Sequence, residues 1–154
     1  MIFDGIRRRN MHKNRTCLCF FALLVCTCLL LTACFSLTRK EKAYYKERDN
    51  YITVTGIVAD VHYNEDLEAF YFNFYELTPK LDDRYLKIVG DNVRIAEENG
   101  MMDRIGEGSV VEFVTAPRYF GDGYVMPIVA LSCDGVCFLE FEEGYLNLLA
   151  WLEA

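Results

Sequence analysis

The sequence predicts a mainly β domain with helices, preceded by an N-terminal targeting segment. Several stretches after residue 50 are rich in β-branched and aromatic residues, and one of them alternates strictly between two kinds of side chain. Two later stretches place apolar residues at helical spacing. The chain has 154 residues, which is enough for one domain beside the targeting segment.

The first three strands are predicted over residues 51–63, 69–77 and 84–90. The first (YITVTGIVADVHY) is rich in β-branched residues and ends at the turn NEDLE, and the third reads RYLKIVG. The second (AFYFNFYEL) alternates between a phenylalanine face and a polar face, which consist of Phe70, Phe72 and Phe74, and of Tyr71, Asn73 and Tyr75. Because successive side chains of a strand point to opposite faces, we expect the phenylalanines to lie in the core.

A helix is predicted after the third strand. Asp91 or Asn92 can cap its start, and Gly100 ends or kinks it. Three further strands are expected over residues 106–117, 124–133 and 136–139.

A final helix begins at about Phe141. Its apolar stripe, which should dock on the body, consists of Phe141, Tyr145, Leu148 and Leu152. A helix between strands three and four is the mark of the OB-fold, a five-stranded Greek-key barrel. The element order therefore predicts an OB-fold-like five-stranded Greek-key barrel with an added C-terminal helix.

Two stretches also resemble a known group of proteins. VRIAEENGMMDRIGEGSVVEFVTAPRYFGDGYVMPIVAL and DGVCFLEFEEGYLNLLAWL are similar to small OB-fold lipoproteins and membrane-anchored proteins of Gram-positive bacteria. The resemblance covers roughly residues 50 to 153. It implies a fold and a location, and it carries no catalytic residue across.

The N-terminal segment has the three-part pattern of a secretory signal. Residues 1–16 are basic, and residues 17–35 (CLCFFALLVCTCLLLTACF) carry no charge. The ending Leu31-Thr32-Ala33-Cys34 resembles the bacterial lipobox, in which the cysteine thiol accepts a diacylglycerol. An uncleaved membrane-spanning anchor is the alternative, because the run is near the length of about 20 residues that a span needs.

These features predict three parts: a lipoprotein signal peptide over residues 1–33, a lipid-anchored tether over 34–50 and an extracytoplasmic domain over 51–154. The basic start favours a cytoplasmic N-terminus. Under either alternative the domain is expected on the outer face of the cell membrane, attached by lipid on Cys34 or by a single N-terminal span.

The charge of the mature chain excludes one class of partner. From residue 34 onward it has 11 basic and 22 acidic side chains, a formal net charge of −11. A nucleic-acid-binding protein needs a basic surface, so no nucleic-acid partner is expected.

The chemistry-bearing residues predict neither an enzyme nor a cofactor. The nucleophile motif GxSxG and the Ser-x-x-Lys pattern are both missing from the sequence. His62 lies near four acidic residues, but a zinc site normally needs several His or Cys ligands. We therefore interpret that stretch as a solvated turn and expect no metal site; its acidic residues are Asp60, Glu65, Asp66 and Glu68.

The aromatic surface is the candidate binding site. OB-folds bind ligands across strands two and three, between the loops that join strands one to two and four to five. Tyrosine suits sugar rings and protein surfaces alike, because a flat apolar ring carries a hydroxyl. The candidate residues are Tyr71, Asn73, Tyr75, Arg118, Tyr119, Phe120, Asp122 and Tyr124. The alternative is that the tyrosines pack under the C-terminal helix.

Cys133 and Cys137 flank the residues DGV. If these three residues form the hairpin loop, the two cysteines oppose each other and a disulfide is geometrically possible. If the turn is Asp134-Gly135 alone, Cys133 faces Val136 and the cysteines are small core residues.

Together these observations predict a non-enzymatic, lipid-anchored binding or scaffold module of the bacterial cell envelope. Its partner would be an envelope protein or a cell-wall glycan. The alternative is a protein that binds a small ligand, either a solute or a glycan, or that assists an enzyme on the same membrane face.

Overall fold

The computed structural model describes residues 40, 42–82, 85–118 and 125–154. The chain divides into two units, Met1–Lys40 and Glu41–Ala154. All statements below concern the second unit. Within the described residues, no helix is long and apolar enough to cross a membrane.

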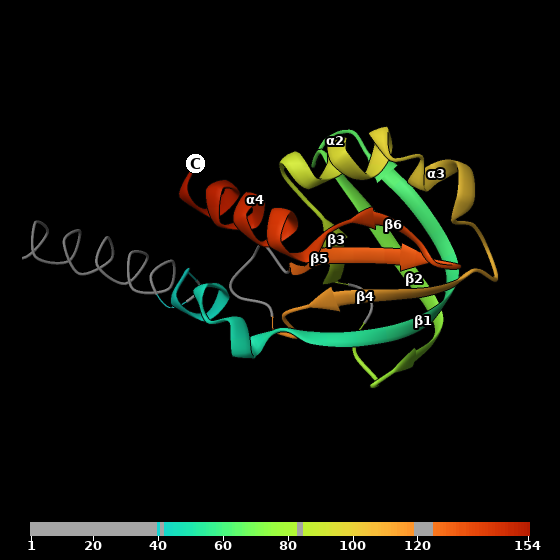
Figure 1. The fold of residues 1–154 in the computed structure, drawn as a ribbon, viewed down its shortest axis with the longest axis horizontal. Coiled ribbons are helices and arrows are strands. Elements are labelled where there is room, and N and C mark those ends of the chain that lie inside the picture. The colour runs from blue at the N-terminus through green and yellow to red at the C-terminus, as the bar shows by residue number, and fades with distance from the viewer. Residues whose placement is uncertain (1–39, 41, 83–84, 119–124) are drawn as a thin grey trace, which may run out of the picture. The chain divides into compact units, whose positions relative to one another are not determined.

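The second unit is mainly β, as the sequence predicts. Its strands are β1 (Ile52–Asn64), β2 (Ala69–Thr78), β3 (Leu86–Ile88), β4 (Val110–Thr115), β5 (Met126–Cys133) and β6 (Val136–Leu139). They form one sheet in the order β3-β2-β1-β4-β5-β6 (Figure 1). A parallel pairing of β3 with β5 joins the two sides, so the pairings among β1 to β5 close into a ring.

Strand β1 is long enough to pair with both of its neighbours. Residues 52–57 pair with β4 and residues 55–64 with β2, so the partners overlap at residues 55–57, and the register with β2 shifts between Ile57 and Asp60. Gly56 lies in this overlap. A Cβ on Gly56 would come within 2.6 Å of the Phe74 ring, so the missing side chain lets the strand and the ring approach each other closely.

The helices lie where the sequence places them. α2 (Asp91–Glu98) and α3 (Met101–Arg104) connect β3 to β4, and α4 (Phe141–Glu153) follows β6. Gly100 separates α2 from α3 in the left-handed conformation (φ 75°), which glycine adopts without strain. Residues 42–46 are helical as well, and a short 3-10 helix, η1 (Arg48–Asn50), leads into β1.

The predicted phenylalanine face is confirmed. Phe70 and Phe72 are buried in the core inside the ring, and Phe74 is partly buried against it. Phe113 of β4 joins them, and the rings of Phe74 and Phe113 stack with centroids 5.3 Å apart. Strict alternation on β2 therefore fixes which face of the sheet is inside.

Helix α4 docks on the outer side of β5. Tyr145 and Leu148 are buried, whereas Phe141 and Leu152 are partly buried, which confirms the predicted stripe. A Cβ on Gly144 would lie 2.0 Å from the carbonyl oxygen of Val129, a distance that no side chain tolerates. Gly144 thus allows the helix to touch the backbone of the strand.

Residues 42–50, which the sequence assigns to the tether, pack against the domain. The sequence suggests a tether over residues 34–50, but the compact unit begins at Glu41. Tyr45 is only 1% exposed, and Tyr44 and Tyr51 pack against the same cluster as α4. Residues 42–50 belong to the domain because their tyrosines bury apolar rings that the surrounding charges conceal in the sequence.

Candidate functional site

A row of three side chains crosses the outer face of β1, β2 and β3. His62, Tyr71 and Lys87 are direct partners in the strand register. The His62 and Tyr71 rings are stacked with centroids 5.4 Å apart, and the Lys87 ammonium lies 4.5 Å from the centre of the Tyr71 ring. Because β2 lies between β1 and β3, the tyrosine ring is covered from both sides.

The two neighbours of the Tyr71 ring limit how Tyr71 can contact a ligand. A sugar or another flat ligand stacks on an open aromatic face. Both faces of Tyr71 are occupied, so its edge and hydroxyl are the parts available to a partner. The residue also packs against the cluster that contains the α4 residues Leu148 and Leu152, so it shares features of both interpretations of the sequence.

Lys87 is the residue that sequence reasoning missed. It is 9% exposed, and no carboxylate of the described residues lies within 4.0 Å of its ammonium. Its apolar stem is buried along the sheet, while the charge interacts with the ring of Tyr71. The signal was a lone cation inside the apolar stretch YLKIV.

Asn73 lies one step further along β2 on the same face as Tyr71. It pairs in register with Asp60, whose carboxylate lies 2.8 Å from His62 Nδ1. Asp60, His62 and Asn73 thus extend the row into a polar face. In the part of the chain that the structure describes, no group of three or more His, Cys, Asp or Glu side chains could hold a metal ion.

Tyr75 and Arg118 have other neighbours. Tyr75 is 66% exposed at a register irregularity of β2, and its hydroxyl donates to the Glu107 carboxylate at 2.5 Å. That hydrogen bond raises the pKa of Tyr75. The Arg118 guanidinium lies over the Tyr44 ring, 5.5 Å from its centre. The predicted residues Cys34, Tyr119, Phe120, Asp122 and Tyr124 lie outside the described residues.

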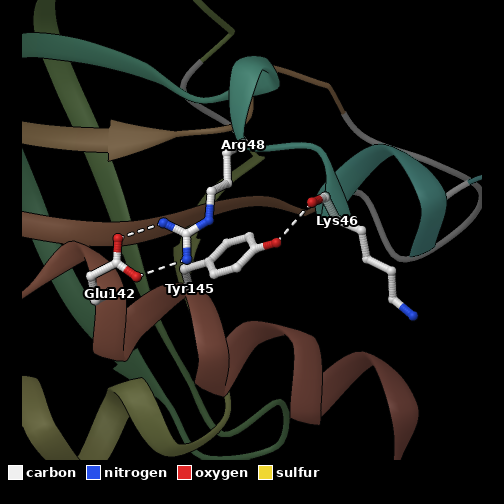
Figure 2. Close-up of polar contacts among 4 residues, drawn as sticks. All are labelled: Lys46, Arg48, Glu142 and Tyr145. Atoms are coloured by element: carbon white, nitrogen blue, oxygen red, sulfur yellow. Dashed lines mark hydrogen bonds and ion pairs between the residues drawn. The ribbon is translucent and has the colours of Figure 1, made fainter.

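A second cluster joins the N-terminal segment to α4, and we call it the seam. Its members are Tyr45, Lys46, Arg48, Tyr51, Glu142 and Tyr145. Arg48 forms two parallel hydrogen bonds with the Glu142 carboxylate, at 2.5 and 2.7 Å (Figure 2). The same guanidinium lies 4.6 Å from the centre of the Tyr145 ring, whose hydroxyl donates to the Lys46 carbonyl at 2.8 Å.

Tyr45 fixes the other side of the seam. Its hydroxyl lies 2.9 Å from the carbonyl oxygen of Arg118 and 2.8 Å from that of Val125. A hydroxyl has one hydrogen, so the two carbonyls share it. The Tyr51 hydroxyl donates to the Tyr45 carbonyl at 2.9 Å, and burial raises the pKa of Tyr51. The seam therefore ties residues 42–51 to α4 and to both ends of the β4–β5 connection.

The β5–β6 hairpin has the second of the two turns that the sequence left open. Cys133 and Cys137 are free cysteines, the first buried and the second exposed. The turn is Asp134-Gly135, so Cys133 pairs with Val136 and Cys137 with Ser132. Neighbouring register positions point to opposite faces of the hairpin, so it does not bring the two sulfur atoms together. Burial raises the pKa of the Cys133 thiol.

No protein-family model matches the chain, and it has no match among curated proteins or among solved structures. The resemblance that the sequence suggests stays a prediction.

Proposed function

We propose that this chain is a non-enzymatic binding module, held on the outer face of a bacterial cytoplasmic membrane by lipid on Cys34. The basic start, the uncharged run and the lipobox-like ending support the anchor. The seam supports a short connection, because six residues separate Cys34 from the compact unit that begins at Glu41. Six extended residues reach about 20 Å, so the domain would stay close to the membrane.

We also propose that the domain is an OB-fold-like Greek-key barrel. The ring β1-β2-β3-β5-β4 and the parallel pairing of β3 with β5 support this assignment. The helices between β3 and β4 support it further. In such barrels the outer face of strands two and three binds ligands, and this is where Tyr71 and Lys87 lie.

The row His62–Tyr71–Lys87 carries the proposal of binding. It combines the exposed His62 ring with the covered Tyr71 ring and the buried Lys87 across three strands. Surface grooves of 380, 390 and 420 Å³ lie elsewhere on the domain. Because His62 and Lys87 flank the Tyr71 ring, the row suits the surface of an envelope protein better than a flat small molecule that stacks on an open aromatic face.

Capture of partners from membrane extracts tests the row. Lys87→Met keeps the buried stem and removes the charge, so we expect the protein to stay folded and to capture less of its partner. Lys80→Met is the matched control, because it removes a charge from an exposed lysine. Equal capture by wild type and Lys87→Met would contradict the proposal that the row binds the partner.

A separate variant tests the anchor. Cys34→Ala should block lipidation and leave the precursor at its larger mass, as measured by mass spectrometry of the membrane fraction. A variant that is processed and anchored like the wild type would rule out lipid on Cys34. The row can still bind a partner in that case. A negative result for the anchor therefore does not contradict the proposal of binding, and the reverse holds too.

One observation favours a second candidate, the binding of a small anionic ligand. Lys87 is nine-tenths buried without a carboxylate among the described residues, and a buried charge is stabilised when an ion of opposite sign pairs with it. A thermal shift with phosphate that disappears in Lys87→Met would support this candidate over the first.

A further inference from the structure

A groove of 380 Å³ lies at the end of the domain formed by the β1–β2 turn, α2 and the end of α4. Three of its lining side chains are large, apolar and exposed, namely Tyr63 (44%), Leu67 (61%) and Trp151 (41%). The groove shares no residue with the row His62–Tyr71–Lys87.

The aromatic wall of the groove is held in place by the backbone. A Cβ on Gly90 would lie 3.0 Å from the Trp151 side chain, so the indole rests against the Gly90 backbone. Gly90 has a φ of 61°, which favours glycine. Tyr63 is held by the Phe70 ring, with centroids 5.2 Å apart. Both rings are therefore positioned before a ligand arrives.

The charge of the groove is negative. Glu68, Asp91 and Glu97 line it and are exposed, and none of them has an ion pair with a described residue. The one basic side chain in the lining, Arg94, is bound to Glu98 at 2.6 Å. A ligand would thus meet three carboxylates that form no ion pair with a described residue, beside two aromatic rings, although the Arg94 charge also acts on Asp91.

We infer that the groove binds a basic segment of a protein partner, in which a Lys or Arg side chain lies next to an apolar one. The cation would interact with the carboxylates and with the faces of Trp151 and Tyr63, because aromatic rings attract cations. The apolar neighbour would cover Leu67. The net charge of −7 on the full chain attracts such a segment at long range.

A neutral glycan suits the groove less well. Stacking of a sugar would use the aromatic rings, but it would also remove water from the three carboxylates without supplying a positive charge. The inference goes beyond the proposed function, because it concerns a different surface and does not depend on the lipid.

The single tryptophan of the chain makes the test local. Trp151 is the only Trp, so its fluorescence and its one indole N–H signal in a nitrogen-15 NMR spectrum both report on the groove. The full chain in a non-ionic detergent is titrated with the peptide acetyl-Leu-Lys-Leu-Lys-amide. Acetyl-Leu-Glu-Leu-Glu-amide and the trimer of N-acetylglucosamine are titrated in parallel.

We expect a saturable change in the Trp151 signals with the Lys peptide alone. The double variant Glu68→Gln, Glu97→Gln should weaken this binding about tenfold, because two charge contacts are lost. Glu112→Gln, an exposed carboxylate on β4, should leave it unchanged. All of these side chains are exposed, so the variants should fold.

Three outcomes would overturn the inference. One is saturation by the glycan without saturation by the Lys peptide, which would indicate a carbohydrate site. Another is equal binding of the Lys and Glu peptides, which would indicate apolar contact alone. The third is no change of the Trp151 signals at millimolar Lys peptide, which would leave the groove without this ligand class. None of these outcomes affects the row or the anchor.

Discussion

Phenylalanine fills the inside of the ring of strands, whereas tyrosine dominates the seam between the N-terminal segment and α4. In the core, Phe72 and Phe113 are 1% exposed and are held by packing alone. In the seam, Tyr45 and Tyr145 are also buried, but each hydroxyl bonds to a backbone carbonyl far away in the sequence. The two regions show two ways of using a buried aromatic ring.

The core and the seam contribute differently to the fold. Packing of apolar rings is strong but not directional, so it stabilises the ring of strands as a whole. A hydrogen bond contributes less free energy, but it fixes which carbonyl meets which hydroxyl. The core therefore determines stability, and the seam determines where residues 42–51 attach.

The largest effect is expected in the core. Phe72→Ala should lower the free energy of unfolding by about 3–5 kcal/mol, because it removes a buried ring and leaves a cavity. Urea unfolding followed by circular dichroism measures the loss. Tyr75→Ala on the same strand is the control, and its midpoint should move little because the ring is exposed. A loss below about 1 kcal/mol for Phe72→Ala would contradict the assignment of the inner face.

The contact between α4 and β5 should come next. Gly144→Ala places a methyl group against the carbonyl of Val129, so α4 must shift away from β5. This shift should lower the free energy of unfolding by about 1–3 kcal/mol. Gly106→Ala is the matched control, since nothing lies within 4 Å of a Cβ there. Equal melting temperatures for the two variants would mean that α4 does not lie this close to β5.

The seam can be tested without changing its shape. Tyr45→Phe keeps the ring and leaves the carbonyls of Arg118 and Val125 without their shared donor, which should cost about 1–2 kcal/mol. Tyr63→Phe is the control, because this ring is 44% exposed. Amide hydrogen exchange should also become faster at residues 42–51 in Tyr45→Phe. Unchanged exchange there would argue against the hydroxyl as the attachment.

The smallest effect is expected at the exposed ion pair of the seam. Arg48 lowers the pKa of Glu142 below its ordinary value of 4.5, so the pair contributes stability while the carboxylate is ionised. This contribution is present above pH 4.5 and is lost as the pH falls through the lowered pKa. The stability difference between wild type and Arg48→Met should therefore be larger at pH 7 than at about pH 3. A difference that grows as the pH falls would contradict this sign.

The contrast also explains how much could be predicted from the sequence. The strands, the helices and the inner face of β2 follow from periodicities that extend over a few residues, such as the alternation from Phe70 to Tyr75. The seam joins Arg48 to Glu142, which are 94 positions apart in the sequence. A periodicity over a few residues cannot predict such a long-range contact. Tyr44 and Tyr45 are the only local indication that this segment packs on the domain. The charged residues around them are typical of a solvated tether.

The candidate site divides in the same way. The sequence places Tyr71 and Asn73 on the outer face correctly, because alternation fixes the face. It does not reveal that His62 and Lys87 cover the Tyr71 ring, because that depends on the register of three strands. The position of the turn at Asp134-Gly135 likewise depends on which residues of β5 and β6 pair. This register determines whether Cys133 and Cys137 lie opposite each other.

The shared hydroxyl of Tyr45 has a consequence for how this domain can be re-engineered or can diverge. The carbonyl oxygens of Arg118 and Val125 lie 2.9 and 2.8 Å from one oxygen atom, so they are at most 5.7 Å apart. Positions 118 and 125 are thus held side by side by the Tyr45 hydroxyl. A longer insert would add only a small closure entropy, about 0.6 kcal/mol for each doubling of its length. We therefore expect a longer chain between positions 118 and 125 to leave the Tyr45 hydrogen bonds in place, as hydrogen exchange at residues 42–51 would show.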